Sequence, residues 1–161
     1  MKRLFAILGT AILLVACAQA PAPRTDVVNA WSIERPFDDV WQAAIEAVPE
    51  MGLEIDKAQI ETGLITSVEA ELPERTSKQY ADWGKLSFTQ FQKGFRGKFN
   101  IYVRKTGEGQ TELKMISVYK IIYSDSLISS EGDRDLWERP AVSTGKREAE
   151  FYALIRKKLG I

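Results

Sequence analysis

Cys17 is the only cysteine in the 161-residue chain, and there is no histidine. Serine–histidine triads and histidine-bearing zinc sites are therefore excluded, and the chain has no Gly-Lys-Ser/Thr phosphate loop. A carboxylate pair like that of a glycosidase is still possible, because its members meet only in the fold. Glu69, Glu71 and Glu74 are candidates for such a pair. A cluster of this kind is more typical of a solvated edge, so we expect no enzymatic activity.

A second acidic cluster invites a calcium interpretation. Its members are Asp125, Glu131, Asp133, Asp135 and Glu138. Their spacing lacks the regular ligand pattern and the closing glutamate of an EF-hand loop. We therefore expect neither a metal ion nor another cofactor. Acidic and basic residues balance over the whole chain, whereas a nucleic-acid partner calls for a basic excess.

Residues 1–16 have the layout of a secretory signal. Lys2 and Arg3 precede an uncharged apolar run over residues 4–16, and a polar stretch with prolines follows. As a helix this run would reach about 20 Å, which is short of a hydrocarbon core of about 30 Å. The sequence therefore predicts a cleaved signal peptide and not a spanning helix.

The end of this signal indicates how Cys17 is used. Leu14, Val15 and Ala16 directly precede the cysteine, and the Leu-Val-Ala-Cys sequence resembles the lipobox of bacterial lipoproteins. The resemblance implies that the Cys17 sulfur takes a diacylglyceryl group, that the chain is cut before it, and that the new amine is acylated, for example with palmitate. Two or more acyl chains anchor a protein stably in a membrane. An idle cysteine beside an ordinary cleavage site is the alternative.

Residues 17–26 contain little that can pack and include two prolines, which predicts a flexible tether behind the lipidated N-terminus. This tether would hold a single domain over residues 27–161 within about 30 Å of the lipid. Ala18 stands where the lipoproteins' inner-membrane retention signal has Asp. The resemblance thus implies the outer membrane, with the domain in the periplasm. The expected partners are the membrane, through the acyl chains, and an envelope protein.

Two amphipathic helices are predicted in the domain. The first has an apolar stripe at helical spacing, made of Phe37, Val40, Trp41, Ala44, Ile45 and Val48. Pro49 and Gly52 should end it near residues 48–51. The second runs from about Ser143 to Leu159, where a hydroxyl of Ser143 or Thr144 would cap its start and Gly160 would close it.

Strand patterns occupy residues 27–33, 53–58, 64–70, 95–105 and 111–123. The last of these is apolar on both sides, so either both faces are covered or one is offered to a partner. Residues 71–94 lack clear periodicity and are predicted to be a long loop, with a hint of a short extra strand around Leu86 and Phe88. Residues 124–140 are polar and acidic, which predicts a surface loop.

This order predicts an α+β domain with two layers, in which two helices pack on a mainly antiparallel sheet (β-α-β-β-β-β-α). The sequences FDDVW (37–41), MGLEID (51–56) and TGLI (62–65) resemble the helix-grip domains of the BamC family of outer-membrane assembly lipoproteins. The likeness covers residues 27–70 in pattern and 95–159 in element order. It implies a helix-grip-like fold and the same compartment.

Together these features predict a non-enzymatic interaction or assembly module, anchored by lipid at the outer membrane. Aromatic and basic residues that suit protein contacts or anionic headgroups predict its interaction surface. The surface comprises Tyr80, Trp83, Lys85, Phe88, Phe91 and Trp137. Alternatively, these aromatic residues fold back on the core. A second possible function is a small carrier that binds an apolar ligand or lipid between helix and sheet.

Overall fold

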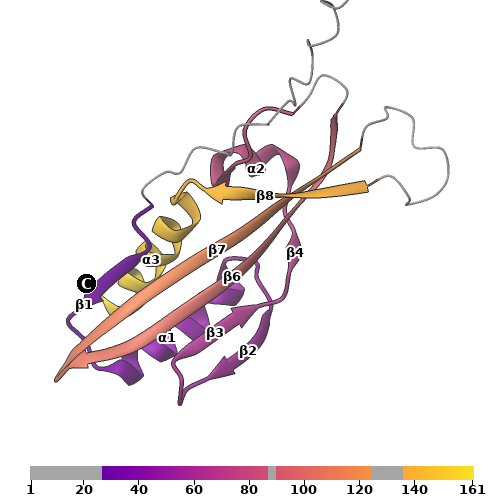
Figure 1. Ribbon diagram of the computed structural model, residues 1–161. Helices are drawn as coiled ribbons and strands as arrows, with labels where there is room; N and C mark the ends of the chain where they lie inside the picture. The colour runs from indigo at the N-terminus through magenta and orange to yellow at the C-terminus, as the bar shows by residue number, and fades with distance from the viewer. Residues whose placement is uncertain (1–26, 87–89, 125–135) are drawn as a thin grey trace, which may run out of the picture.

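The computed structural model describes residues 27–86, 90–124 and 136–161. In chain order the elements are β1 (Ala30–Ile33), α1 (Phe37–Glu50), β2 (Ile55–Gln59), β3 (Leu64–Ser67), β4 (Ala70–Glu71), α2 (Glu74–Tyr80), β5 (Ala81–Asp82), β6 (Phe91–Gly107), β7 (Gln110–Ser124), β8 (Leu136–Ser143) and α3 (Lys146–Leu159). The described chain contains eight antiparallel strands and three helices, where the sequence predicts five strands and two helices (Figure 1). The predicted α+β class with a mainly antiparallel sheet is confirmed.

The long hairpin of β6 and β7 is the centre of the sheet. Its register runs from Phe91 opposite Ser124 to Gly107 opposite Gln110. The central path of the sheet is β2-β3-β6-β7-β8-β5, while β4 pairs with β6 and β1 pairs with β7. Side chains of a strand alternate between its two faces, so each residue of this hairpin belongs to one side of the sheet.

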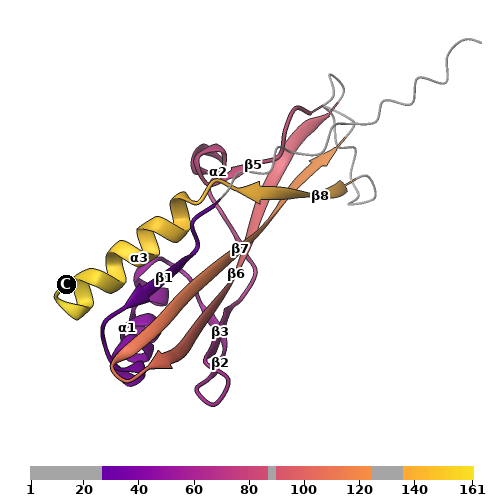
Figure 2. The same ribbon diagram turned by 60° about the vertical axis from the view of Figure 1, so that its left-hand side comes forward.

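One side of the sheet carries the core. Phe99 and Met115 of the hairpin are fully buried there, and so are Val40 of α1 and Phe151 of α3. The two views agree that α1 and α3 lie on this side, with α2 near the start of α3 (Figures 1 and 2). Burying these apolar side chains is the main favourable contribution to folding.

The structure confirms the predicted first helix. α1 ends at Glu50, with Pro49 inside its last turn and Gly52 at a φ of 72°. The last helix also ends where the sequence predicts, because Gly160 takes a left-handed conformation after Leu159.

The cap predicted for α3 is wrong. The helix begins at Lys146, and its N-cap residue is Gly145, which has no side-chain oxygen to accept a hydrogen bond from the backbone N–H groups of the first turn. The Ser143 hydroxyl accepts from the Gly145 N–H at 3.1 Å and donates to the Glu148 carboxylate at 2.7 Å. Thr144 donates instead to the Gln79 carbonyl oxygen at 2.6 Å. The Ser143 hydroxyl thus links the N-cap residue to the first turn of α3, and the Thr144 hydroxyl holds the preceding loop against the end of α2.

The prediction of a loop over residues 71–94 is also wrong. This segment contains the end of β4, then α2, β5 and the first residues of β6. The helix Glu74–Tyr80 has the sequence ERTSKQY, in which no apolar stripe marks a helical period. The strands β4 and β5 have only two residues each, which is too short to show alternation.

The predicted surface loop at 124–140 is wrong over its last five residues. Leu136 to Pro140 belong to β8, which pairs with β7 from Tyr119 to Ser124. Charged residues and Pro140 hide this strand in the sequence, since both are depleted in strands. The acidic residues 125–135, and with them most of the calcium candidates, lie outside the described residues.

Candidate functional site

The residues predicted to carry the lipid lie outside the described part of the chain. These are Leu14, Val15, Ala16 and Cys17. The described chain begins at Val27, whose Cγ1 lies 3.1 Å from the position that a Cβ on Gly145 would take. Within the described residues, no helix is long and apolar enough to cross a membrane.

Trp83 and Tyr80 face inward and do not form an exposed surface. Trp83 is only 7% exposed, and its ring packs against Phe95 with a centroid distance of 5.6 Å. Its carbonyl oxygen accepts a hydrogen bond from Arg139. Tyr80 is half-buried beside α3. Both therefore follow the alternative prediction, in which the aromatic residues of this segment fold back on the core.

Phe91 and Trp137 come together at one end of the sheet, although 45 residues separate them in the sequence. Phe91 lies opposite Ser124, which lies opposite Leu136, and the next row joins Gln92, Tyr123 and Trp137. We call this end the sheet tip. It consists of Phe91, Lys93, Tyr123, Leu136 and Trp137. Lys85 is exposed and follows β5, while Phe88 lies outside the described residues.

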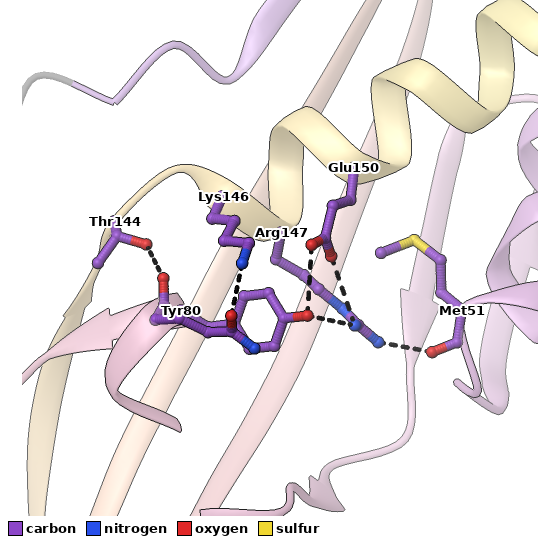
Figure 3. A network of polar contacts seen from close by, with 7 residues as sticks. Met51, Tyr80, Thr144, Lys146, Arg147 and Glu150 are labelled. Atoms are coloured by element: carbon purple, nitrogen blue, oxygen red, sulfur yellow. Dashed lines mark hydrogen bonds and ion pairs between the residues drawn. The ribbon is translucent and has the colours of Figure 1, made fainter. Parts of the chain in front are cut away.

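A polar network ties α2 to α3 and to the end of α1 (Figure 3). Arg147 donates to the Met51 carbonyl oxygen at 2.5 Å and pairs with Glu150 at 3.7 Å. Its guanidinium also lies against the Tyr80 ring, at 5.1 Å from the centroid. Its side chain is 15% exposed, which makes these contacts a structural joint and not an open binding site.

Tyr119 and Glu148 are buried polar residues behind this joint. Burial raises the pKa of the Tyr119 hydroxyl well above its ordinary value, and the nearby Glu148 carboxylate raises it further. The phenol is therefore neutral at physiological pH. Glu148 is 1% exposed and accepts from Ser143, so its carboxylate is occupied with holding the start of α3.

Two of the three candidate catalytic carboxylates contact a cation. Glu69 pairs with Lys120 at 3.2 Å, and Glu71 pairs with Arg96 at 3.5 Å. The hydrogen bonds that the Lys120 ammonium donates to Glu69 and Glu138 raise its pKa. The Glu74 side chain is outside what the structure describes. Among the residues that are described, no group of three or more acidic or cysteine side chains could hold a metal ion.

On the side of the sheet opposite the helices, no described helix or strand covers β3, β6 and β7 (Figures 1 and 2). Three cross-strand rows make up this open face, which consists of Leu64–Tyr102–Lys114, Thr66–Asn100–Ile116 and Lys98–Val118. Tyr102 is 40% exposed and Val118 is 44% exposed. Lys98 pairs with Asp56 at 3.9 Å at the border of this face. Apolar groups in a charged frame are typical of a contact surface.

A comparison with protein families finds none that matches this chain, and a comparison with curated proteins finds no match either.

A hollow of about 460 Å³ lies between the start of α1, the β2–β3 turn, the end of β6 and the β6–β7 turn. Asp38 and Glu61 line it together with Arg104 and Lys105. Charges of both signs share the space, so the hollow favours no ion of one sign. Of the described features, the open face and the sheet tip are the two that offer exposed apolar groups on rigid strands.

Proposed function

We propose that the chain is a lipid-anchored lipoprotein of the outer membrane, whose periplasmic domain acts without catalysis as an interaction or assembly module. The charged and apolar leader and the Leu-Val-Ala-Cys motif ending at Cys17 support the anchor and the address. The helix-grip likeness belongs to the same proposal. Its support is the placement of α1 and α3 on one side of an antiparallel sheet.

The open face is the observation that carries the interaction module. Tyr102 and Val118 are held on the two longest strands and are exposed, whereas Phe99 and Met115 on the other face of the same strands are fully buried. Groups fixed on a sheet lose little conformational freedom when a partner binds, because their backbone is already ordered. This favours binding of an envelope protein across β6 and β7.

The carrier function has weaker support. A carrier needs room for its ligand between helix and sheet. At that interface Val40, Phe99, Phe151 and Ile155 are all fully buried and belong to one core cluster. Filling the interface with protein side chains favours the interaction module over the carrier.

The anchor is tested by the mass of the mature N-terminus. The chain expressed in a Gram-negative host and extracted from membranes should begin at Cys17 and carry acyl chains. Cys17→Ala should abolish the modification and leave the protein with its uncleaved leader. A mature chain that begins elsewhere, with an unmodified thiol, would contradict the anchor.

The partner is tested by photo-crosslinking from the open face in intact cells. A photoreactive residue at Asn100, in the middle row of the face, should capture one distinct envelope protein. Ala153 is exposed on α3 and provides the matched control position, from which this protein should not be captured. Adding Val118→Glu should abolish the capture, since it places a charge in the contact. Equal capture from both positions, or none, would rule the open face out.

A further inference from the structure

The sheet tip combines apolar, aromatic and basic groups at one end of the molecule. Leu136 is 47% exposed and its neighbour Trp137 is 57% exposed. Adjacent residues of a strand point to opposite faces, so these two side chains flank the end of the sheet on both sides. Tyr123 lies beside Trp137 in the register, and Lys93 is exposed next to the same row. The end of a sheet that carries apolar groups on both faces is suited to insertion into a membrane, whereas one apolar face is suited to binding on a flat surface.

The start of the described chain runs toward this tip. β1 is antiparallel to β7, so its N-terminal end points to the end of β7 that forms the tip. The Asn29 carbonyl oxygen accepts from the Met115 N–H at 2.8 Å, which fixes the level at which the chain arrives. From Met115 to Tyr123, β7 covers about 26 Å at roughly 3.3 Å per residue. Residues 17–26 could span up to about 35 Å when extended, which is enough to bring Cys17 level with the tip.

We propose that the sheet tip inserts into the lipid headgroup region of the leaflet that holds Cys17. This inference rests on the proposed lipid anchor. Tryptophan and tyrosine are enriched at membrane–water interfaces, where the ring meets acyl chains and the polar atom meets headgroups. Leu136 adds an apolar group on the other side, and the Lys93 ammonium can contact lipid phosphates.

The charges of the described residues around the tip allow this insertion. Glu138 directly follows Trp137, and its carboxylate pairs with Arg96 at 3.4 Å and with Lys120 at 3.3 Å. Arg96 and Lys120 also pair with Glu71 and Glu69, at 3.5 and 3.2 Å, so the cluster holds three carboxylates and two cations. Bringing it toward lipid phosphates is less costly because each carboxylate has a cation beside it. Insertion of the tip would leave the open face standing away from the bilayer, where a periplasmic partner can reach it.

Quenching of tryptophan fluorescence by lipid tests the inference. The acylated full-length mature protein is reconstituted in vesicles of phosphatidylethanolamine and phosphatidylglycerol that contain phospholipids brominated near the headgroup. Bromine should quench part of the emission of the unchanged protein. Trp137→Phe should lose this quenchable part. Trp31→Phe is the matched control and should retain it, because Trp31 is half-buried and stacked on Tyr152 at 4.6 Å.

A second variant keeps Trp137 and changes its neighbour. Leu136→Asp should reduce the quenching, since a carboxylate opposes entry into the headgroup region. If the acylated protein is quenched equally with and without Trp137, or not at all, the tip does not insert, and the lipid anchor stands unaffected. If the mass of the N-terminus reveals no acyl chain, the anchor and the inference both fail.

Discussion

The guanidinium carbon of Arg147 lies 5.1 Å from the centre of the Tyr80 ring. The same guanidinium donates to the Met51 carbonyl oxygen, and the Lys146 ammonium approaches the Tyr80 ring at 5.7 Å. The end of α1, the short helix α2 and the start of α3 thus meet at one side chain (Figure 3). This contact explains how α2, whose sequence has no apolar stripe, is held against the core.

Arg147→Ala should lower the free energy of unfolding by about 2 kcal/mol, because it removes a charge-assisted hydrogen bond and leaves the Met51 carbonyl oxygen without its donor. Urea denaturation followed by circular dichroism measures the change. Arg156→Ala provides the control on the same helix, since Arg156 is exposed in the last turn and its removal should cost less than about 0.5 kcal/mol. Equal costs for the two variants would contradict the structural role of Arg147.

Gly97 should not tolerate a side chain. A Cβ at this position would lie 2.8 Å from Leu72 Cδ1 and 3.1 Å from two atoms of the Tyr119 ring. Gly97→Ala should therefore cost about 1–3 kcal/mol through overpacking of the core. Gly107→Ala on the same strand is the matched control, because its Cβ would find only ordinary contacts at 3.6 Å or more. Thermal unfolding of both variants compares them, and an unchanged midpoint for Gly97→Ala would refute the close approach.

The two faces of the hairpin should respond differently to truncation. Phe99→Ala empties a fully buried site and should cost about 3–5 kcal/mol. Tyr102→Ala lies three residues away on the open face and should cost no more than about 1 kcal/mol, mainly through lost cross-strand contacts. Chemical denaturation measures both. If the cost of Tyr102→Ala approached that of Phe99→Ala, Tyr102 would have to be covered, and the open face could not serve as a contact surface.

Local periodicity was enough to predict α1, α3 and the central hairpin. α1 and β6 each repeat apolar residues at their own period, so short windows of sequence identify them. The same patterns could not place α2 or β8, whose stability comes from distant partners such as Arg147 and β7. Propensity is a weak guide where tertiary contacts decide the structure.

The candidate surfaces depend even more on long-range pairing. Both faces of β7 are apolar, so only the position of the helices reveals that Val118 is exposed while Met115 is buried. The sheet tip joins Phe91 to Leu136 through the register of three strands, and no local spacing contains that information. The sequence leaves open whether Trp83 faces outward or folds back on the core, and only its packing on Phe95 shows that it is buried.

The ion pairs that link α3 to α1 should make stability depend on pH at both extremes. Lys158 contacts Glu46 at 3.4 Å and also pairs with Glu50. The hydrogen bond to Glu50 raises the pKa of Lys158 above its ordinary 10.5. The hydrogen bond from Gln42 is the main cause that lowers the pKa of Glu46 below its ordinary 4.5, and a hydrogen bond from Lys158 lowers this pKa further.

A raised lysine pKa stabilises the fold below pH 10.5, and this contribution disappears as the pH rises through the folded-state pKa. A lowered glutamate pKa stabilises the fold above pH 4.5 and is lost as the pH falls through its folded-state pKa. At neutral pH, the melting temperature of Lys158→Met should thus be below that of the unchanged protein. The difference between the two melting temperatures should disappear at acidic and at alkaline pH. High salt should narrow it as well. Lys157→Met removes an exposed charge from the same turn, so an identical pH profile for this control would exclude the ion pairs as the cause.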